Sequence, residues 1–196
     1  SCADARKEKK PLTPPDVVAL LKSCAKRKDL VGGIRIHDHL VKLGCLQRDI
    51  YLGNALINLY VKCGEFIKAR DLFDVIQGRD VVTWTTLIGA YTHHGHCEDS
   101  MTLFYRMRAE SLVPDAFAFV HIFKACATSS IGASDIGERM HVEVINGGPS
   151  VGANDPFVGI ALLDMYAKCG SLSKARQVFD SLPIQSLIAW NALMAG

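Results

Sequence analysis

The chain has 196 residues, a formal net charge of +2 and an isoelectric point near 8.2. Its hydrophobic content of 49% is enough for a packed core and excludes an intrinsically disordered protein. The charges nearly balance, so charge alone does not indicate nucleic-acid binding. No apolar run approaches the roughly 18 residues of a membrane span, so we expect a soluble protein with no membrane partner.

The two ends of the chain predict a fragment. Residues 1–13 (SCADARKEKKPLT) mix charges of both signs and run into a Pro-Pro pair, which is typical of a linker or disordered end. The sequence starts at Ser1, and its last segment stops just after one helical face has begun. We therefore expect any targeting peptide to lie outside it.

Two parts of the sequence are similar to each other. LYVKCG at 59–64 returns as MYAKCG at 165–170, and residues 55–74 match 161–180 at more than half of their positions. Such self-similarity is typical of proteins built from stacked repeats. It predicts an all-α fold, a right-handed α-solenoid of helix-turn-helix repeats.

The first clear hairpin begins with a helix over 54–62. Its apolar residues Ala55, Leu56, Leu59 and Tyr60 recur at the spacing of one buried stripe. Gly64 is expected to end this helix, because glycine adopts the left-handed conformation of a helix C-terminus at little steric cost. A second helix is then marked by the apolar residues Ile67, Ala69, Leu72, Phe73 and Ile76.

The same pattern predicts a further hairpin over 81–115. It has helices near 83–92 and 97–109, with Gly95 ending the first and Pro114-Asp115 closing the unit. Neither helix can bury its apolar stripe alone, so stacked hairpins must share one core. The repeats are placed at residues 14–49, 50–80, 81–115, 116–155 and 156–186, with a partial repeat at 187–196.

The repeats differ in length, whereas tetratricopeptide arrays hold a constant period of about 34 residues. The run GNALINLYVKCGEFIKARDLFDVIQGRD, then VVTWTTLIGAYTHHGHCEDSMTLFYRMRAESLVPD and FKACA…GERMH, resembles plant pentatricopeptide repeats (PPR). The resemblance covers residues 14–196 and is to the PLS class, which alternates standard, long and short motifs. It implies binding of single-stranded RNA, with one base contacted by two or three side chains of each repeat.

In this family the fifth and last residues of a motif face the edge of the base. The resemblance therefore implies base-reading pairs Asn54 with Asp80, a combination associated with uracil, and Thr85 with Asp115, associated with guanine. We expect these side chains to point into one shared trough along the first helices.

The other repeats depart from the base-reading pattern. In 156–186 the pair is Ile160 with Ser186, and isoleucine cannot form a hydrogen bond to a base, so we expect weak discrimination there. Asn191 opens a sixth site without its partner. The long motifs carry apolar fifth residues, which favours a spacing role, in the pairs Val18 with Asp49 and Val120 with Asp155.

Two further sets of contacts follow from the resemblance. Second residues Tyr51, Val82 and Phe157 are implied to flank the bases, where stacking contributes roughly 1–3 kcal/mol per base. Lys62 and Lys168 are candidate phosphate contacts. The alternative for both lysines is a solvated side chain that the helix dipole favours in the last turn.

The sequence contains no nucleophile–base pair, phosphate-cradling loop or paired-carboxylate motif, so we expect no catalytic residue, cofactor or small-molecule substrate. His141-Val142-Glu143 matches the His-x-Glu of zinc deaminases, but their Pro-Cys-x-x-Cys does not follow. His141 aligns with His37, so we interpret it as a structural residue. We also expect the side chains of Tyr60 and Tyr166 to pack in the core. Four potential metal ligands lie in one inter-helix turn, namely His93, His94, His96 and Cys97, but we expect no metal site there.

The sequence thus predicts the RNA-recognition part of a longer protein of the mitochondrion or chloroplast. Its role would be organellar RNA processing or C-to-U editing, with editing-complex proteins as further partners and any deaminase supplied elsewhere. Two alternatives remain. One is a protein-interaction scaffold of the tetratricopeptide type, and the other is homodimerisation through the exposed last repeat.

Overall fold

The computed structural model describes residues 13–46, 49–129, 133–146 and 155–194, so the predicted linker at 1–12 lies outside the described residues. The described residues form eleven helices and no strand. None of these helices has the length and apolar character that a membrane crossing requires. The first helices of the hairpins are α1 (Pro14–Arg27), α3 (Ile50–Lys62), α5 (Val81–His93), α7 (Ala116–Thr128), α9 (Pro156–Lys168) and α11 (Leu187–Met194). The second helices are α2 (Leu30–Lys42), α4 (Phe66–Val75), α6 (Cys97–Ala109), α8 (Ala133–Ile145) and α10 (Leu172–Ser181).

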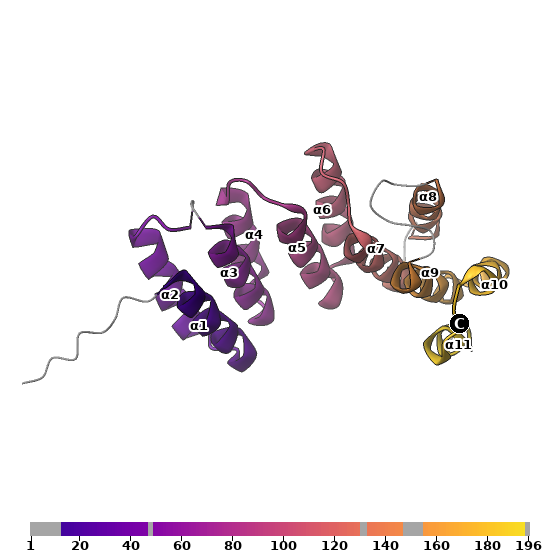
Figure 1. Cartoon of the computed structure of the whole chain (residues 1–196), viewed down its shortest axis with the longest axis horizontal. Coiled ribbons are helices and arrows are strands. Elements are labelled where there is room, and N and C mark those ends of the chain that lie inside the picture. Colours follow the sequence, from indigo (N-terminus) through magenta and orange to yellow (C-terminus); the bar gives the residue numbers. More distant parts are fainter. Residues whose placement is uncertain (1–12, 47–48, 130–132, 147–154, 195–196) are drawn as a thin grey trace, which may run out of the picture. The chain divides into compact units, whose positions relative to one another are not determined.

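The chain divides into two compact units, residues 1–77 and 78–196. In the first unit α1 packs against α3, α2 packs against both, and α4 packs against α3. In the second unit α5, α7, α9 and α11 pack in succession, and each second helix packs between its own first helix and the next one (Figure 1). Each unit is therefore a stack of hairpins in two layers, and the predicted fold class, an all-α helical-repeat solenoid, is confirmed.

The predicted ends of the first helices are confirmed. α3 ends at Lys62, and Gly64 follows with a φ of 80°. α5 ends at His93, and Gly95 also has a φ of 80°. This left-handed backbone is the conformation that glycine adopts without the steric cost of a Cβ atom. It turns the chain into the second helix of each hairpin.

More side chains of α3 are buried than the sequence pattern predicts. The expected stripe of α3 is buried, but so are Ile57 and Val61, because α3 packs against α1 on one side and against α2 and α4 on others. Ile67 lies in the second helix that it marks, but its side chain is 78% exposed. Ala69, Leu72 and Phe73 take the inward face of α4 instead, together with Ile76 just after it.

A histidine–tyrosine hydrogen bond joins a second helix to the next first helix in both units. His37 Nδ1 lies 2.6 Å from the Tyr60 hydroxyl, and His141 Nδ1 lies 2.9 Å from the Tyr166 hydroxyl. The rings of each pair meet edge to face. The predicted core position of the two tyrosines is confirmed, since both are buried. Glu143, the other half of the deaminase-like motif, pairs with Arg108.

Burial controls the ionisation of these pairs. It lowers the pKa of His37 and His141, because the charged imidazole would lose hydration. The same burial raises the pKa of both tyrosines to about 12. Both pairs are therefore neutral between the ordinary histidine pKa and the raised tyrosine pKa of about 12.

The hairpin of α9 and α10 offers a direct test of this packing. Leu163→Ala should lower the free energy of unfolding by about 2–5 kcal/mol, because Leu163 is fully buried and its truncation leaves a cavity. Leu172→Ala, at a site 53% exposed, should change it by no more than about 0.5 kcal/mol. Urea unfolding followed by circular dichroism measures both values. Equal effects of the two substitutions would contradict the described core.

The pKa directions of the histidines predict acid destabilisation. In the unfolded chain His37 and His141 have their ordinary pKa of 6.5, and in the folded chain it is lower, so the unfolded state binds more protons. The contribution of these two histidines to the free energy of unfolding should therefore be constant above about pH 7 and fall as the pH is lowered through that value. Urea titrations between about pH 5 and 8 measure the slope. The double variant His37→Gln with His141→Gln should reduce it, whereas His39→Gln, at an exposed site, should leave it unchanged.

Candidate nucleic-acid interface

Aspartates start four of the first helices. Asp49, Asp80, Asp115 and Asp155 are the N-caps of α3, α5, α7 and α9, and the Oδ1 atom of each accepts a hydrogen bond from a backbone N–H of the first turn. The shortest of these bonds measure 2.8 to 2.9 Å. Before α11, Ser186 Oγ accepts from the Ala189 N–H in the same way at 3.3 Å. The last residue of each repeat therefore stabilises the next helix, a role that the Asp-before-apolar pattern could have predicted.

The predicted pair of the 81–115 repeat is in contact. Thr85 Oγ1 donates a hydrogen bond to Asp115 Oδ1 at 3.3 Å, which places the fifth and last residues side by side where α5 meets α7. Thr85 is only 8% exposed, so the expectation that it points into an open trough was wrong. Asp115 is half-buried, and both of its hydrogen bonds use Oδ1. Its Oδ2 atom is thus the acceptor left for a ligand.

Asn54 and Asp80, the predicted pair of the 50–80 repeat, belong to two different units. Asn54, on α3, is half-buried, and its Oδ1 atom is buried without a hydrogen-bond partner. A buried amide oxygen without a partner costs roughly 1–3 kcal/mol. Asp80 is exposed, and its Oδ1 accepts from both the backbone and the hydroxyl of Thr83.

The first repeat forms a pocket on the first-helix surface. The pocket has a volume of about 410 Å³, within the usual range of ligand sites. It joins Val18 and Asp49, the fifth and last residues of this repeat, with Tyr51, the second residue of the next. Lys22 also lines the pocket, and the sequence pattern did not predict it as a site residue. An apolar fifth residue thus still takes part in a concave site.

The second residues of the repeats form a series of exposed apolar side chains. Tyr51, Val82 and Phe157 were predicted, and each is between 59% and 76% exposed. The structure adds Phe117 and Ile188, which are exposed to a similar extent. They hold the second place of their repeats, so the repeat register would have identified them. In the second unit, successive first helices thus carry exposed apolar side chains at the same position, Val82, Phe117, Phe157 and Ile188.

The remaining predicted residues lie on the last two first helices. Ile160 is half-buried on α9, and Ser186 caps α11. Asn191 is exposed on α11. None of these three side chains is brought into a base-reading pair by the described structure.

The two predicted phosphate contacts differ in their surroundings. Lys168 pairs with Asp164 one turn earlier in α9, with 2.7 Å between Nζ and Oδ2. In α3 the place of that aspartate is taken by Asn58, and the exposed Lys62 has no ion pair within the described residues. The charge of Lys62 is therefore uncompensated, whereas that of Lys168 is largely neutralised.

A second basic group lies where α5 meets α7. Lys124 Nζ is 3.5 Å from His93 Nδ1, and the rings of His93 and His121 meet edge to face. Burial, and then the neighbouring charge of Lys124, lowers the pKa of His93. Across the described ranges, no three His, Cys, Asp or Glu side chains are arranged to hold a metal ion.

Comparisons with known proteins identify the family. Residues 79–128 match a model of the PPR repeat family, and residues 54–81 and 161–183 match a model of the PPR repeat. Together these ranges cover half of the chain. The chain belongs to the pentatricopeptide repeat family.

The similar proteins are longer than this chain. It is 36% identical over 188 residues to the pentatricopeptide repeat-containing protein At4g25270, chloroplastic, of Arabidopsis thaliana, covering 94% of this chain and 34% of that protein. It is 35% identical over 180 residues to At3g53360, mitochondrial, of the same plant, covering 91% and 22%. The chain thus spans about a third or less of the length of these curated relatives.

A solved structure has the same fold. The crystal structure of the pentatricopeptide repeat protein PPR10 from maize matches with a TM-score of 0.66 at 18% sequence identity. The match covers 92% of this chain and 26% of that one. At this identity the likeness shows the helical-repeat fold alone.

The capping role of Asp115 can be separated from any role in binding. Asp115→Ala should lower the free energy of unfolding by about 1 kcal/mol, because the first turn of α7 loses its side-chain acceptor. Asp115→Asn should be nearly neutral, since asparagine caps helices as well as aspartate does. Chemical denaturation of both variants measures this. A loss in the asparagine variant as large as in the alanine variant would contradict a simple cap.

Proposed function

We propose that the chain binds single-stranded RNA selectively, with base contacts made by individual repeats of the PLS class. The observation that carries this proposal is the hydrogen bond between Thr85 and Asp115. It joins the fifth and last residues of one repeat, next to the exposed second residues Val82 and Phe117 of that repeat and the following one. A polar pair beside apolar side chains suits a base that is held by its faces and recognised along its edge.

The chemistry of this pair favours guanine. Guanine presents two neighbouring donors on its Watson–Crick edge, and Asp115 has a carboxylate oxygen outside its own hydrogen bonds. The Thr85 hydroxyl donates a hydrogen bond to the Asp115 carboxylate and so holds it in place. The hydroxyl is the polar group at the buried end of the pair. Hydrogen bonds to an ionised carboxylate are about twice as strong as neutral ones.

The affinity would come in part from phosphate contacts. Lys62 has an uncompensated charge on α3, and Lys22 and Lys124 are exposed on α1 and α7. Each phosphate that a lysine neutralises releases counterions, so binding should weaken as salt rises. The nearly balanced net charge of the chain makes these local charges the main source of attraction.

The biological setting follows from the relatives. Their names place them in the chloroplast or the mitochondrion, which supports an organellar location for the protein to which this chain belongs. We infer a role in organellar RNA processing or C-to-U editing, as the recognition part of a longer protein. Editing-complex proteins are the partners that this role implies.

The base preference of the 81–115 repeat tests the proposal. Thr85→Asn should move the preferred base at this repeat from guanine toward uracil, because an amide beside a carboxylate replaces a hydroxyl. A change of about 1–3 kcal/mol in base discrimination is expected for one side chain. Fluorescence anisotropy with pools of short single-stranded RNA, each fixed at one position, measures the preference at two salt concentrations.

Two control variants complete this test. Thr102→Asn makes the same substitution on α6, a second helix, and should leave the base preference unchanged. Lys62→Ala should weaken all RNA sequences alike, because phosphate contacts carry no base information. An unchanged preference in the Thr85 variant would remove the base-reading assignment. Absence of RNA binding at low salt would favour the protein-interaction scaffold instead.

A further inference from the structure

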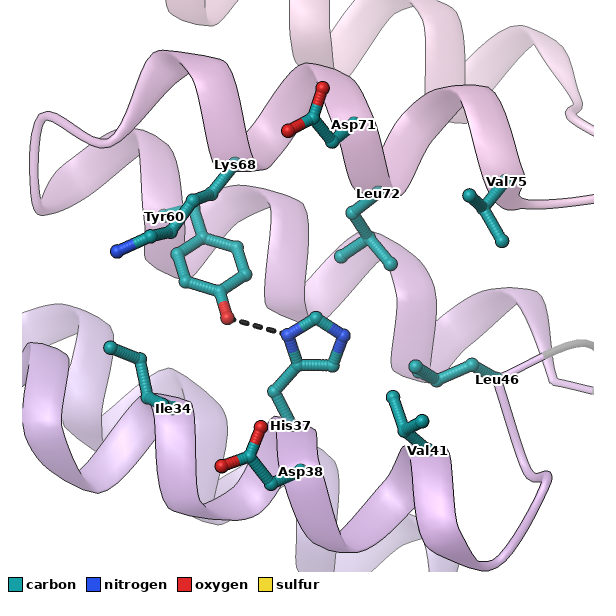
Figure 2. A pocket seen from close by; sticks show the side chains of 10 residues that line it. All are labelled: Ile34, His37, Asp38, Val41, Leu46, Tyr60, Lys68, Asp71, Leu72 and Val75. Atoms are coloured by element: carbon teal, nitrogen blue, oxygen red, sulfur yellow. Dashed lines mark hydrogen bonds between the residues drawn. The ribbon is translucent and has the colours of Figure 1, made fainter.

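The first unit has an open groove between its two second helices, α2 and α4. It has a volume of about 580 Å³, and Figure 2 shows the hydrogen-bonded His37 and Tyr60 between its two helices. The groove lies on the second helices, whereas the proposed base-reading residues lie on the first. It is lined by Ile34, His37, Asp38, Val41, Leu46, Tyr60, Lys68, Asp71, Leu72 and Val75.

The groove is apolar along its length. Ile34 and Val41 project from α2, and Leu72 and Val75 project from α4 (Figure 2). Val41 and Val75 are both more than half exposed. Within the described residues α2 and α4 make no helix–helix contact with each other, since each packs against α3. The exposed side chains of Val41 and Val75 are therefore not covered by the facing helix.

The second unit contains an equivalent pair of helices, α8 and α10, and there the space is bridged. Glu138 on α8 forms an ion pair with Lys174 on α10. Ile34 holds the place of Glu138 in the first unit, so Lys68, which corresponds to Lys174, pairs instead with Glu65 beside its own helix. The pocket that remains beside His141 measures only about 170 Å³. The ion pair between Glu138 and Lys174 thus bridges a space that stays open between α2 and α4.

The neighbouring pair of second helices in the second unit is bridged as well. Arg108 on α6 pairs with Glu143 on α8 at 2.9 Å. No such ion pair joins α2 to α4 among the residues that the structure describes. Of these three pairs of second helices, α6 with α8, α8 with α10, and α2 with α4, only the last has no ion pair between its helices among the described residues.

Two carboxylates give the groove an acidic edge on each side. Asp38 lies on α2 and Asp71 on α4, both exposed, and neither forms an ion pair with a described residue. The corresponding residues of the second unit, Val142 and Gln177, carry no charge. The charge of Lys68 is compensated by Glu65. An apolar groove with acidic edges repels phosphate and attracts cationic groups.

We propose that this groove binds an amphipathic helix of a partner protein, with apolar residues at helical spacing and lysine or arginine beside them. A helix laid between two helices of 13 and 10 residues would contact them over about 15–20 Å, or three to four turns. Its apolar side chains would fill the space between Val41 and Val75, and its cations would meet Asp38 and Asp71. This is the helix-in-groove mode of peptide recognition.

A pair of synthetic peptides tests the charge requirement with the whole 196-residue chain. One is a fluorescein-labelled helical peptide of about 15 residues, with leucine on one face and lysine beside it, long enough for the groove. The other has glutamate in place of every lysine. Fluorescence anisotropy should show at least tenfold tighter binding of the cationic peptide. Equal affinities would overturn the proposal.

Variants of the chain locate the site. Asp38→Asn with Asp71→Asn should weaken the cationic peptide roughly tenfold, as expected for the loss of two solvent-facing ion pairs. Glu98→Gln with Asp135→Asn removes the same charge from exposed sites on α6 and α8 and should have no effect. Ile34→Glu should also weaken binding, because it offers Lys68 the partner that Glu138 gives Lys174. Circular dichroism verifies that each variant is folded.

Chemical-shift mapping decides where the peptide lies. Amide shifts induced by the cationic peptide should be confined to α2, α4 and the segments beside them. Shifts concentrated on the first helices, or unchanged affinity in the double aspartate variant, would overturn the proposal. Self-association of the chain that Ile34→Glu abolishes would assign the groove to a second copy, and this too would overturn it.

Discussion

The packing of consecutive first helices against each other is the interaction on which the rest of the structure depends. α3 is buried on more than one side because α1, α2 and α4 all contact it, and α7 and α9 are enclosed in the same way. This packing fixes where each helix begins relative to the next, and so it brings Thr85 of one helix to the cap of the following one. The second helices cover the remaining apolar side chains of the first helices. The outward-facing residues of the second helices can therefore differ between repeats.

The sequence predicts the hairpins well, because helical spacing and terminating glycines are local signals. Gly64 and Gly95 turn the chain where expected, and the expected stripe of α3 is buried. Its failures are at positions that neighbouring repeats control. Ile57 and Val61 are buried outside the expected stripe because α1, α2 and α4 all contact α3, and Thr85 is covered because α7 packs beside it. Periodicity within one helix carries no information about the distance to the next.

The two copies of the similar hairpins show which parts of a repeat can change independently. Inside, the histidine–tyrosine pairs His37 with Tyr60 and His141 with Tyr166 are the same. Outside, Ile34 in one copy and Glu138 in the other give an open groove and an ion-paired surface. The inner contacts hold the stack together, so the outer faces can acquire separate partners without a change in the fold. A repeat protein can thereby present two independent surfaces on one scaffold.

The aspartates that start the first helices hold two positions at once, the last of one repeat and the cap of the next. Residues that cap well are few: Asp, Asn, Ser and Thr, with glycine tolerated. Any side chain that contacts a base from this place is therefore drawn from a small polar set, whatever base it must recognise. For the proposed RNA binding, helix initiation would therefore limit the choice of side chain at this position, and differences in base preference would have to come from the fifth residue.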